Sequence, residues 1–307
     1  MPRLSRLGGL VTLGALAAAF LVLPHIYANR SLLLSMMAFI TLAQGLNLLY
    51  GFTGYLPFGY VGFFGAGAYG MSLLALHTDL PAPVSVLGGG AAALAVALIV
   101  SPLLRLSGAY FSIANLATSQ MLYFIVANPG LSNITGGPYG LNLERVFDPA
   151  ASYAAMLAVR LIACAVAVYF RGSDFGLALR AMTQKFMSAQ MAGIDIVRSR
   201  LIVWLISAAV AGLAGGCYAW NLSVFYPGAV FSLQISVFAI VFALFGGVGT
   251  VVGPILGAVV LYALYNAIGI SLPQYFELIY GLLIVLLTLF LPDGVLSLFK
   301  RRGIGVL

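Results

Sequence analysis

Residues that could carry acid–base or nucleophilic chemistry are few in this sequence. Only two histidines occur, His25 and His77, and both lie near the ends of long apolar segments. No single apolar segment holds a pair of carboxylates, and no serine nucleophile motif or zinc-ligand spacing is present. The sequence therefore predicts neither an enzyme nor a metal site.

One glycine-rich stretch matches a nucleotide-binding pattern by letter alone. Residues 65–70 read G-x-G-x-x-G, but they lie in an apolar segment with no preceding strand and no acidic residue about 20 positions further on. There is also no phosphate-binding loop with its lysine, so we expect no cofactor to be bound by this chain. Small residues at near-helical spacing allow helices to approach closely in lipid, which is the role we predict for Gly59, Gly62, Gly65 and Gly70.

Uncharged polar residues form a more suggestive pattern. Ser112, Asn115 and Ser119 are spaced i, i+3 and i+7, so they share one face of a helix, and Gln44 and Asn47 form a similar pair. Such a stripe should face other protein or a water-filled path. These five residues are our candidates for a translocation path, and hydrogen bonding between helices is the alternative that stays open.

Charged residues are scarce inside the apolar segments. The aspartates fall near or outside the segment ends, so the proton relay that a self-energised carrier needs is missing from the pattern. Arg160 is the one charge near the middle of a segment. It could meet the carboxylate of a substrate, pair with Glu277, or extend toward the membrane surface.

The composition places these residues in a membrane. Of the 307 residues, 63% are hydrophobic and only 7% are charged, against about 25% charged in soluble domains. The apolar runs do not alternate as porin strands do, so we predict an all-α, polytopic bundle of transmembrane helices. Eight to ten spans fit, and ten is the favoured count: 7–27, 31–50, 56–76, 83–104, 108–127, 153–170, 201–223, 233–246, 254–270 and 275–291.

Basic residues predict the orientation of the bundle. With ten spans and a cytoplasmic N-terminus, the loops 105–107, 171–200 and 292–307 face the cytoplasm and hold most of the Lys and Arg residues. Both termini are then cytoplasmic, loop 128–152 faces outside, and residues 1–307 form a single transmembrane domain. The net charge of +7 is explained by this bias, so no nucleic-acid partner is predicted. The first apolar stretch is long for a signal peptide, and we expect it to remain as an uncleaved helix.

Two glycine-rich stretches, near 51–70 and 246–254, could be broken or re-entrant helices, which would lower the count toward eight. Loop 171–200 is predicted to hold a short helix over 175–192, capped by Ser173 or Asp174 and ended by Gly193. Such a basic helix suits docking to a soluble partner, or it could rest on lipid headgroups. The candidate coupling residues in it are Arg180, Gln184, Lys185, Ala189 and Gly193.

An ordered set of motifs resembles the permeases of branched-chain amino acid ABC importers, in particular their LivM-like branch. The resemblance covers residues 40–295. Its motifs are Gly45-Leu46-Asn47-Leu48-Leu49, Gly51-Phe52-Thr53-Gly54, Phe63-Phe64-Gly65-Ala66-Gly67-Ala68-Tyr69, Tyr110-Phe111-Ser112-Ile113-Ala114, Thr135-Gly136-Gly137, Phe175-Gly176-Leu177-Ala178-Leu179-Arg180-Ala181, Gly193-Ile194-Asp195, Ala211-Gly212-Leu213-Ala214-Gly215, Gly246-Gly247-Val248-Gly249-Thr250 and Gly253-Pro254.

The resemblance implies a set of partners and a location. It implies a second, LivH-like permease subunit, two ATP-binding cassette subunits that carry the ATP, and a periplasmic substrate-binding protein. The chain would then be a multi-pass protein of the bacterial inner membrane, surrounded by lipid, and loop 171–200 would be the coupling loop.

The chain also departs from the family pattern. Pro57 and Tyr60 stand where Ser and His are usual, and Tyr139 stands where an Asp is common. In the coupling helix, Gln184, Lys185 and Phe186 replace acidic residues. The substrate therefore stays open between branched-chain amino acids, other amino acids, urea and small carboxylates.

Overall fold

The computed structural model describes residues 14, 17–24, 29–78, 80–184, 186–191, 193–271, 274–290 and 294–295. The described part is dominated by helices. The long ones are α2 (Arg30–Thr53), α3 (Val61–His77), α4 (Ala82–Ile99), α5 (Ala109–Val126), α7 (Pro149–Gly172), α10 (Ile196–Leu222), α12 (Leu233–Gly246), α13 (Val252–Ser271) and α14 (Phe276–Phe290).

Short elements join these helices. They are η1 (Ser101–Arg105), η2 (Pro129–Leu131), α6 (Ser132–Thr135), η3 (Gly137–Tyr139), η4 (Glu144–Val146), α8 (Asp174–Gln184), α9 (Phe186–Met191) and α11 (Pro227–Val230). Two short strands, β1 (Leu141–Asn142) and β2 (Val224–Phe225), pair antiparallel, with Leu141 opposite Phe225.

The prediction of a polytopic helical protein is confirmed. Within the described ranges, seven helices are long and apolar enough to cross a membrane, and α3 is a shorter apolar helix. The predicted spans from 31–50 onward each coincide with a long helix. The predicted first span, 7–27, lies largely outside the described residues.

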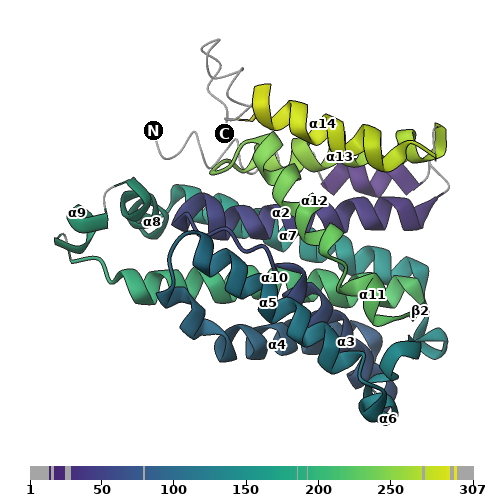
Figure 1. Cartoon of the computed structure of the whole chain (residues 1–307). Coiled ribbons are helices and arrows are strands. Elements are labelled where there is room, and N and C mark those ends of the chain that lie inside the picture. Colours follow the sequence, from purple (N-terminus) through teal and green to yellow (C-terminus); the bar gives the residue numbers. More distant parts are fainter. Residues whose placement is uncertain are drawn as a thin grey trace.

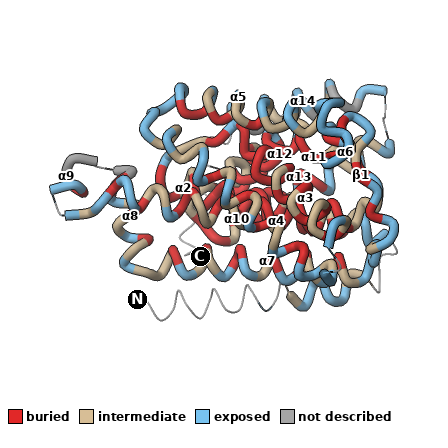
Figure 2. The backbone as a smooth tube through the Cα atoms, turned by 90° about the horizontal axis from the view of Figure 1, so that it is seen from below, coloured by how far each residue is buried: buried red, intermediate tan, exposed pale blue. Residues whose placement is uncertain are grey.

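Helices α3, α4 and α10 pack against one another, and α2 packs against α7, α10, α12 and α13. Figure 1 shows these helices running in roughly the same direction, with α8 and α9 at one end of the bundle and β2 and α6 at the other. Buried residues gather along the middle of the bundle, and exposed residues cover its periphery (Figure 2). Exposed apolar side chains such as Ile113, Phe124 and Leu289 are the ordinary surface of a helix that faces lipid.

Both glycine-rich stretches contain a break between two helices, and a re-entrant segment that would lower the span count stays a prediction. Residues 54–60, the first interruption, separate α2 from α3, and residues 247–251, the second interruption, separate α12 from α13. Gly54 ends α2 with a φ of 75°, and Gly247 and Gly249 also have positive φ, at 111° and 77°. These are conformations that glycine adopts without steric cost.

Candidate functional site

The first interruption leaves backbone groups without helical partners inside the bundle, and side chains from other helices satisfy them. Asn115 of α5 accepts a hydrogen bond from the Gly59 N–H through Oδ1 (2.8 Å), and Ser236 of α12 accepts one from the Val61 N–H (2.8 Å). Ser112 of α5 donates to the Leu56 carbonyl at 2.6 Å. An unpaired buried backbone group costs about 1–3 kcal/mol, so these contacts fix the path of the interruption.

Tyr60 closes the far end of the first interruption. Its side chain is fully buried, and its hydroxyl donates to the Ser207 carbonyl of α10 at 2.9 Å. The Ser207 hydroxyl donates to the Gly45 carbonyl of α2 at 2.7 Å and lies 3.0 Å from the Tyr60 oxygen. One tyrosine thus joins the interruption to two central helices.

The second interruption is held by a single amide of α2. Asn47 accepts from the Gly249 N–H through Oδ1 (2.7 Å) and donates to the Thr250 carbonyl through Nδ2 (2.8 Å). The Thr250 hydroxyl in turn donates to the Gly247 carbonyl at 2.7 Å. Because an amide offers one donor and one acceptor side, Asn47 satisfies two backbone groups at once.

The five predicted path residues therefore have distinct surroundings. Asn47, Ser112 and Asn115 hold the interruptions, while Ser119 donates within its own helix, to the Leu116 carbonyl at 2.8 Å. Gln44 is fully buried, and neither atom of its amide group has a hydrogen-bond partner within the described ranges. All five are buried in the isolated chain, so lining a path stays a prediction for each of them.

Of the predicted packing glycines, Gly62, Gly65 and Gly70 lie in α3, whereas Gly59 lies in the first interruption because α3 begins only at Val61. A Cβ added to Gly59 would overlap the backbone of Asn115, and one added to Gly62 would lie 3.0 Å from the Ser119 Cβ. An added Cβ at Gly65 would meet the Phe231 ring, and one at Gly70 would meet Ala92. These are the positions at which a side chain would push neighbouring elements apart.

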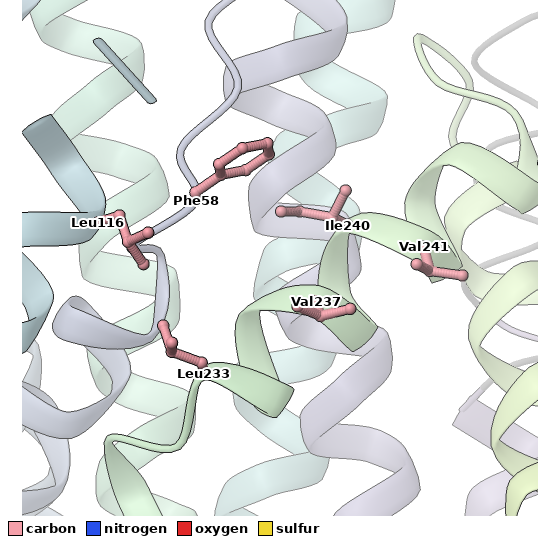
Figure 3. A pocket seen from close by; sticks show the side chains of 6 residues that line it. All are labelled: Phe58, Leu116, Leu233, Val237, Ile240 and Val241. Carbon is pink, nitrogen blue, oxygen red and sulfur yellow. The ribbon is translucent and has the colours of Figure 1, made fainter. Parts of the chain in front are cut away.

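An open apolar groove lies beside the first interruption. Its volume is about 330 Å³, and Phe58 of the interruption, Leu116 of α5 and four residues of α12 line it: Leu233, Val237, Ile240 and Val241. Figure 3 shows Phe58 and Leu116 across the groove from the α12 side chains. The groove places an aliphatic and aromatic wall next to the backbone that Asn115 and Ser112 hold.

A comparison with known protein families shows which family this chain belongs to. Residues 29–288 match the family described as the permease component of the branched-chain amino acid transport system. The chain belongs to this family.

Individual members of the permease family are similar over most of the chain. The high-affinity branched-chain amino acid permease LivM of Salmonella typhimurium is 27% identical over 303 residues, covering 87% of this chain and 69% of LivM. A probable permease LivH of Methanocaldococcus jannaschii is 26% identical and covers 83% of this chain and 87% of that protein. The ribose import permease RbsC of Haemophilus influenzae is 28% identical over a shorter stretch, 45% of each chain.

The segment that the resemblance designates as the coupling loop is helical, but it holds two helices, α8 and α9, instead of the single helix predicted over 175–192. The Ser173 hydroxyl accepts from the Gly176 N–H (3.1 Å) at the start of α8, and Gly193, with a φ of 82°, follows α9. Arg180 donates to the Arg171 carbonyl at 2.8 Å, and Ala189 is buried. Gln184 is the last residue of α8, and Lys185 lies outside the described residues.

Sequence reasoning did not single out Ser207 and Ser236, and it treated Tyr60 only as a departure from the family pattern. The two serines are lone hydroxyls in apolar helices, a signal that also fits a hydroxyl bonded within its own helix, as Ser119 is. Their partners lie 147 and 175 residues away in the sequence, so no local pattern reveals them.

Proposed function

We propose that this chain is the membrane permease subunit of an ATP-driven importer, and that it forms part of the path for branched-chain amino acids. The observation that carries the proposal is the family match over residues 29–288. The seven apolar helices of spanning length in the described part of the chain support it, as does the pair of interruptions that the bundle holds by buried hydrogen bonds. Transporters commonly use broken helices where a solute must meet backbone groups within the membrane.

The finer arrangement belongs to the same proposal. Ten spans with both termini in the cytoplasm would place segment 171–200 on the inner face, where two ATP-binding cassette subunits dock. A second permease subunit would complete the path, and a periplasmic binding protein would deliver the amino acid. In this arrangement ATP is bound and hydrolysed by the partners, and the chain has no enzymatic activity of its own.

We also propose that five polar residues of the path take part in transport by way of the interruptions. They are Gln44, Asn47, Ser112, Asn115 and Ser119. Three of them hold those interruptions. A small movement of α5 would therefore alter the backbone beside the groove at Phe58, and a small movement of α2 would alter the second interruption. Segment 171–200, with Arg180, Gln184, Lys185, Ala189 and Gly193, is the docking surface for the ATPases.

The test is a pull-down of the tagged chain from native membranes in mild detergent, followed by mass spectrometry and reconstitution. We expect a second multi-pass permease and ATPase subunits to be recovered, and uptake of radiolabelled leucine, isoleucine or valine to require ATP and the binding protein. Gradient-driven uptake by the chain alone would overturn the proposal in favour of a self-sufficient carrier. ATP-dependent uptake of other solutes only would overturn the substrate class and leave the importer standing.

A further inference from the structure

Segment 171–200 is joined to the first interruption by a contact at the start of α10. Arg200 donates through Nη1 to the Tyr55 hydroxyl at 2.9 Å, and its guanidinium carbon lies 4.6 Å from the centre of the Tyr55 ring. Tyr55 is the second residue of the interruption, directly after Gly54. A planar guanidinium that both donates to and lies over one aromatic ring fixes that ring more tightly than an ammonium group would.

The face of α10 that carries Arg200 contacts the first interruption as far as Tyr60, at its other end. Arg200, Trp204 and Ser207 are spaced i, i+4 and i+7, so they share one face of the helix. Trp204 packs edge-on against Phe111 (5.7 Å) and Phe63 (4.9 Å), and the Tyr55 ring packs against Phe111 at 4.8 Å. The Ser207 carbonyl then accepts from Tyr60. Both ends of the interruption are thus held by α10, the helix that begins where segment 171–200 ends.

The other side of segment 171–200 reaches the end of α2. The Arg180 guanidinium of α8 lies 5.5 Å from the centre of the Phe52 ring. Phe52 packs edge-on against Phe170, which packs in the same way against Phe175 of α8 (5.9 and 5.5 Å). Segment 171–200 therefore contacts Phe52 and Tyr55, the residues on either side of the turn at Thr53 and Gly54.

We propose that the Arg200–Tyr55 pair is a positioning contact that transmits movement of segment 171–200 to the first interruption. This inference rests on the proposed function, in which segment 171–200 meets the ATPases. A shift of the start of α10 either carries Tyr55 with it or breaks the hydrogen bond, because Arg200 belongs to α10 and Tyr55 to the interruption. Arg200 acts here through Tyr55, and it is not assigned a contact with the transported solute.

The test uses the whole importer complex, purified through this chain and reconstituted with its binding protein. The variants are Tyr55→Phe, which removes the hydroxyl and keeps the ring, and Arg200→Lys, which keeps the charge and loses the planar fork. Arg30→Lys is the matched control, because Arg30 is exposed and lies at the start of α2, outside segment 171–200. The readouts are leucine transported per ATP hydrolysed, complex assembly and the Tm of the complex.

We expect transport per ATP to fall about fivefold or more in each variant, the size of a modest coupling between sites, while assembly and the control stay unchanged. The double variant should be no worse than Tyr55→Phe alone, because Tyr55→Phe already removes the hydrogen bond from Arg200 together with the donation of the Tyr55 hydroxyl to the Leu104 carbonyl (3.5 Å). An unchanged ratio in both variants, or a lower Tm with an unchanged ratio, would overturn the inference and leave the importer function intact. Failure of the unmodified chain to bring down any ATPase would overturn the proposed function instead.

Discussion

At the scale of single residues, the buried polar side chains of this bundle mainly complete the hydrogen bonding of backbone that is not helical. Asn115 does this for the Gly59 N–H, whereas Ser119, one helical turn further along, donates only within its own helix. Two residues of one polar stripe therefore have different structural consequences when they are removed.

We predict that Asn115→Ala destabilises the protein by about 1–3 kcal/mol, because it leaves the Gly59 N–H buried without an acceptor. Ser119→Ala should change stability by less, since the Leu116 carbonyl that it serves can still accept a hydrogen bond within the helix. Thermal unfolding in detergent measures both. Equal Tm values for the two variants would contradict the role given to Asn115.

Arg160 presents the opposite case, a buried charge with little to balance it. It is fully buried on α7, its guanidinium lies 4.0 Å from the centre of the Phe20 ring, and its nitrogens have no hydrogen-bond partner among the described residues. The predicted contact with a substrate stays a prediction, and Glu277 has no described side chain with which to test the predicted pair.

We expect Arg160→Met to raise stability by about 1–4 kcal/mol, the gain seen when buried ionic groups are replaced by apolar ones of similar volume. A cation–π contact contributes only about 0.5–2 kcal/mol, less than the several kcal/mol that burial of the ion costs. The Tm of the Arg160→Met variant in detergent shows whether the substitution raises or lowers stability. A lower Tm would mean that the guanidinium has a stabilising partner.

At the scale of elements, hydropathy was enough to predict the long helices from α2 to α14, and glycine placement marked both stretches where helices break. Long apolar runs predict helices in lipid because every backbone group must be paired there. Hydropathy does not show which side chain crosses to which backbone group. Asn47, for example, meets Gly249 and Thr250 across about 200 residues, a contact that depends on how the helices are packed.

We predict that alanine substitutions of the glycines destabilise the protein to different extents. Gly59→Ala should be strongly destabilising, because its Cβ would overlap the backbone of Asn115, and a backbone cannot rotate away as the end of a side chain can. Gly62→Ala should be milder, since its Cβ would meet the Ser119 side chain at 3.0 Å. Gly281→Ala is the control, because nothing lies within 4 Å of the added Cβ on α14. The order of the three Tm values is the test, and a Gly281 variant as unstable as the Gly59 variant would contradict it.

At the scale of the whole molecule, the bundle connects a predicted ATPase-docking segment at one end to the interruptions in its interior. The segment, residues 171–200, contains α8, α9 and then Gly193, which has a φ of 82° and no atoms within 4 Å of an added Cβ. A substitution of Gly193 changes the backbone conformation without a steric clash. Any loss of transport in such a variant can therefore be attributed to the geometry of the segment.

We predict that Gly193→Ala lowers transport per ATP hydrolysed in the reconstituted importer, whereas Gly193→Asn retains most of it. A left-handed conformation costs an alanine about 1–2 kcal/mol, and asparagine tolerates it better because its side chain can hydrogen-bond locally. The alanine variant would relieve this strain by turning α9 relative to α10, which would displace the surface that meets the ATPase. Substitution of Lys185 should uncouple hydrolysis in the same way. Unchanged coupling in the Gly193→Ala and Lys185 variants would remove the docking role from this segment, and equal losses in the alanine and asparagine variants would show that the left-handed turn is not the cause.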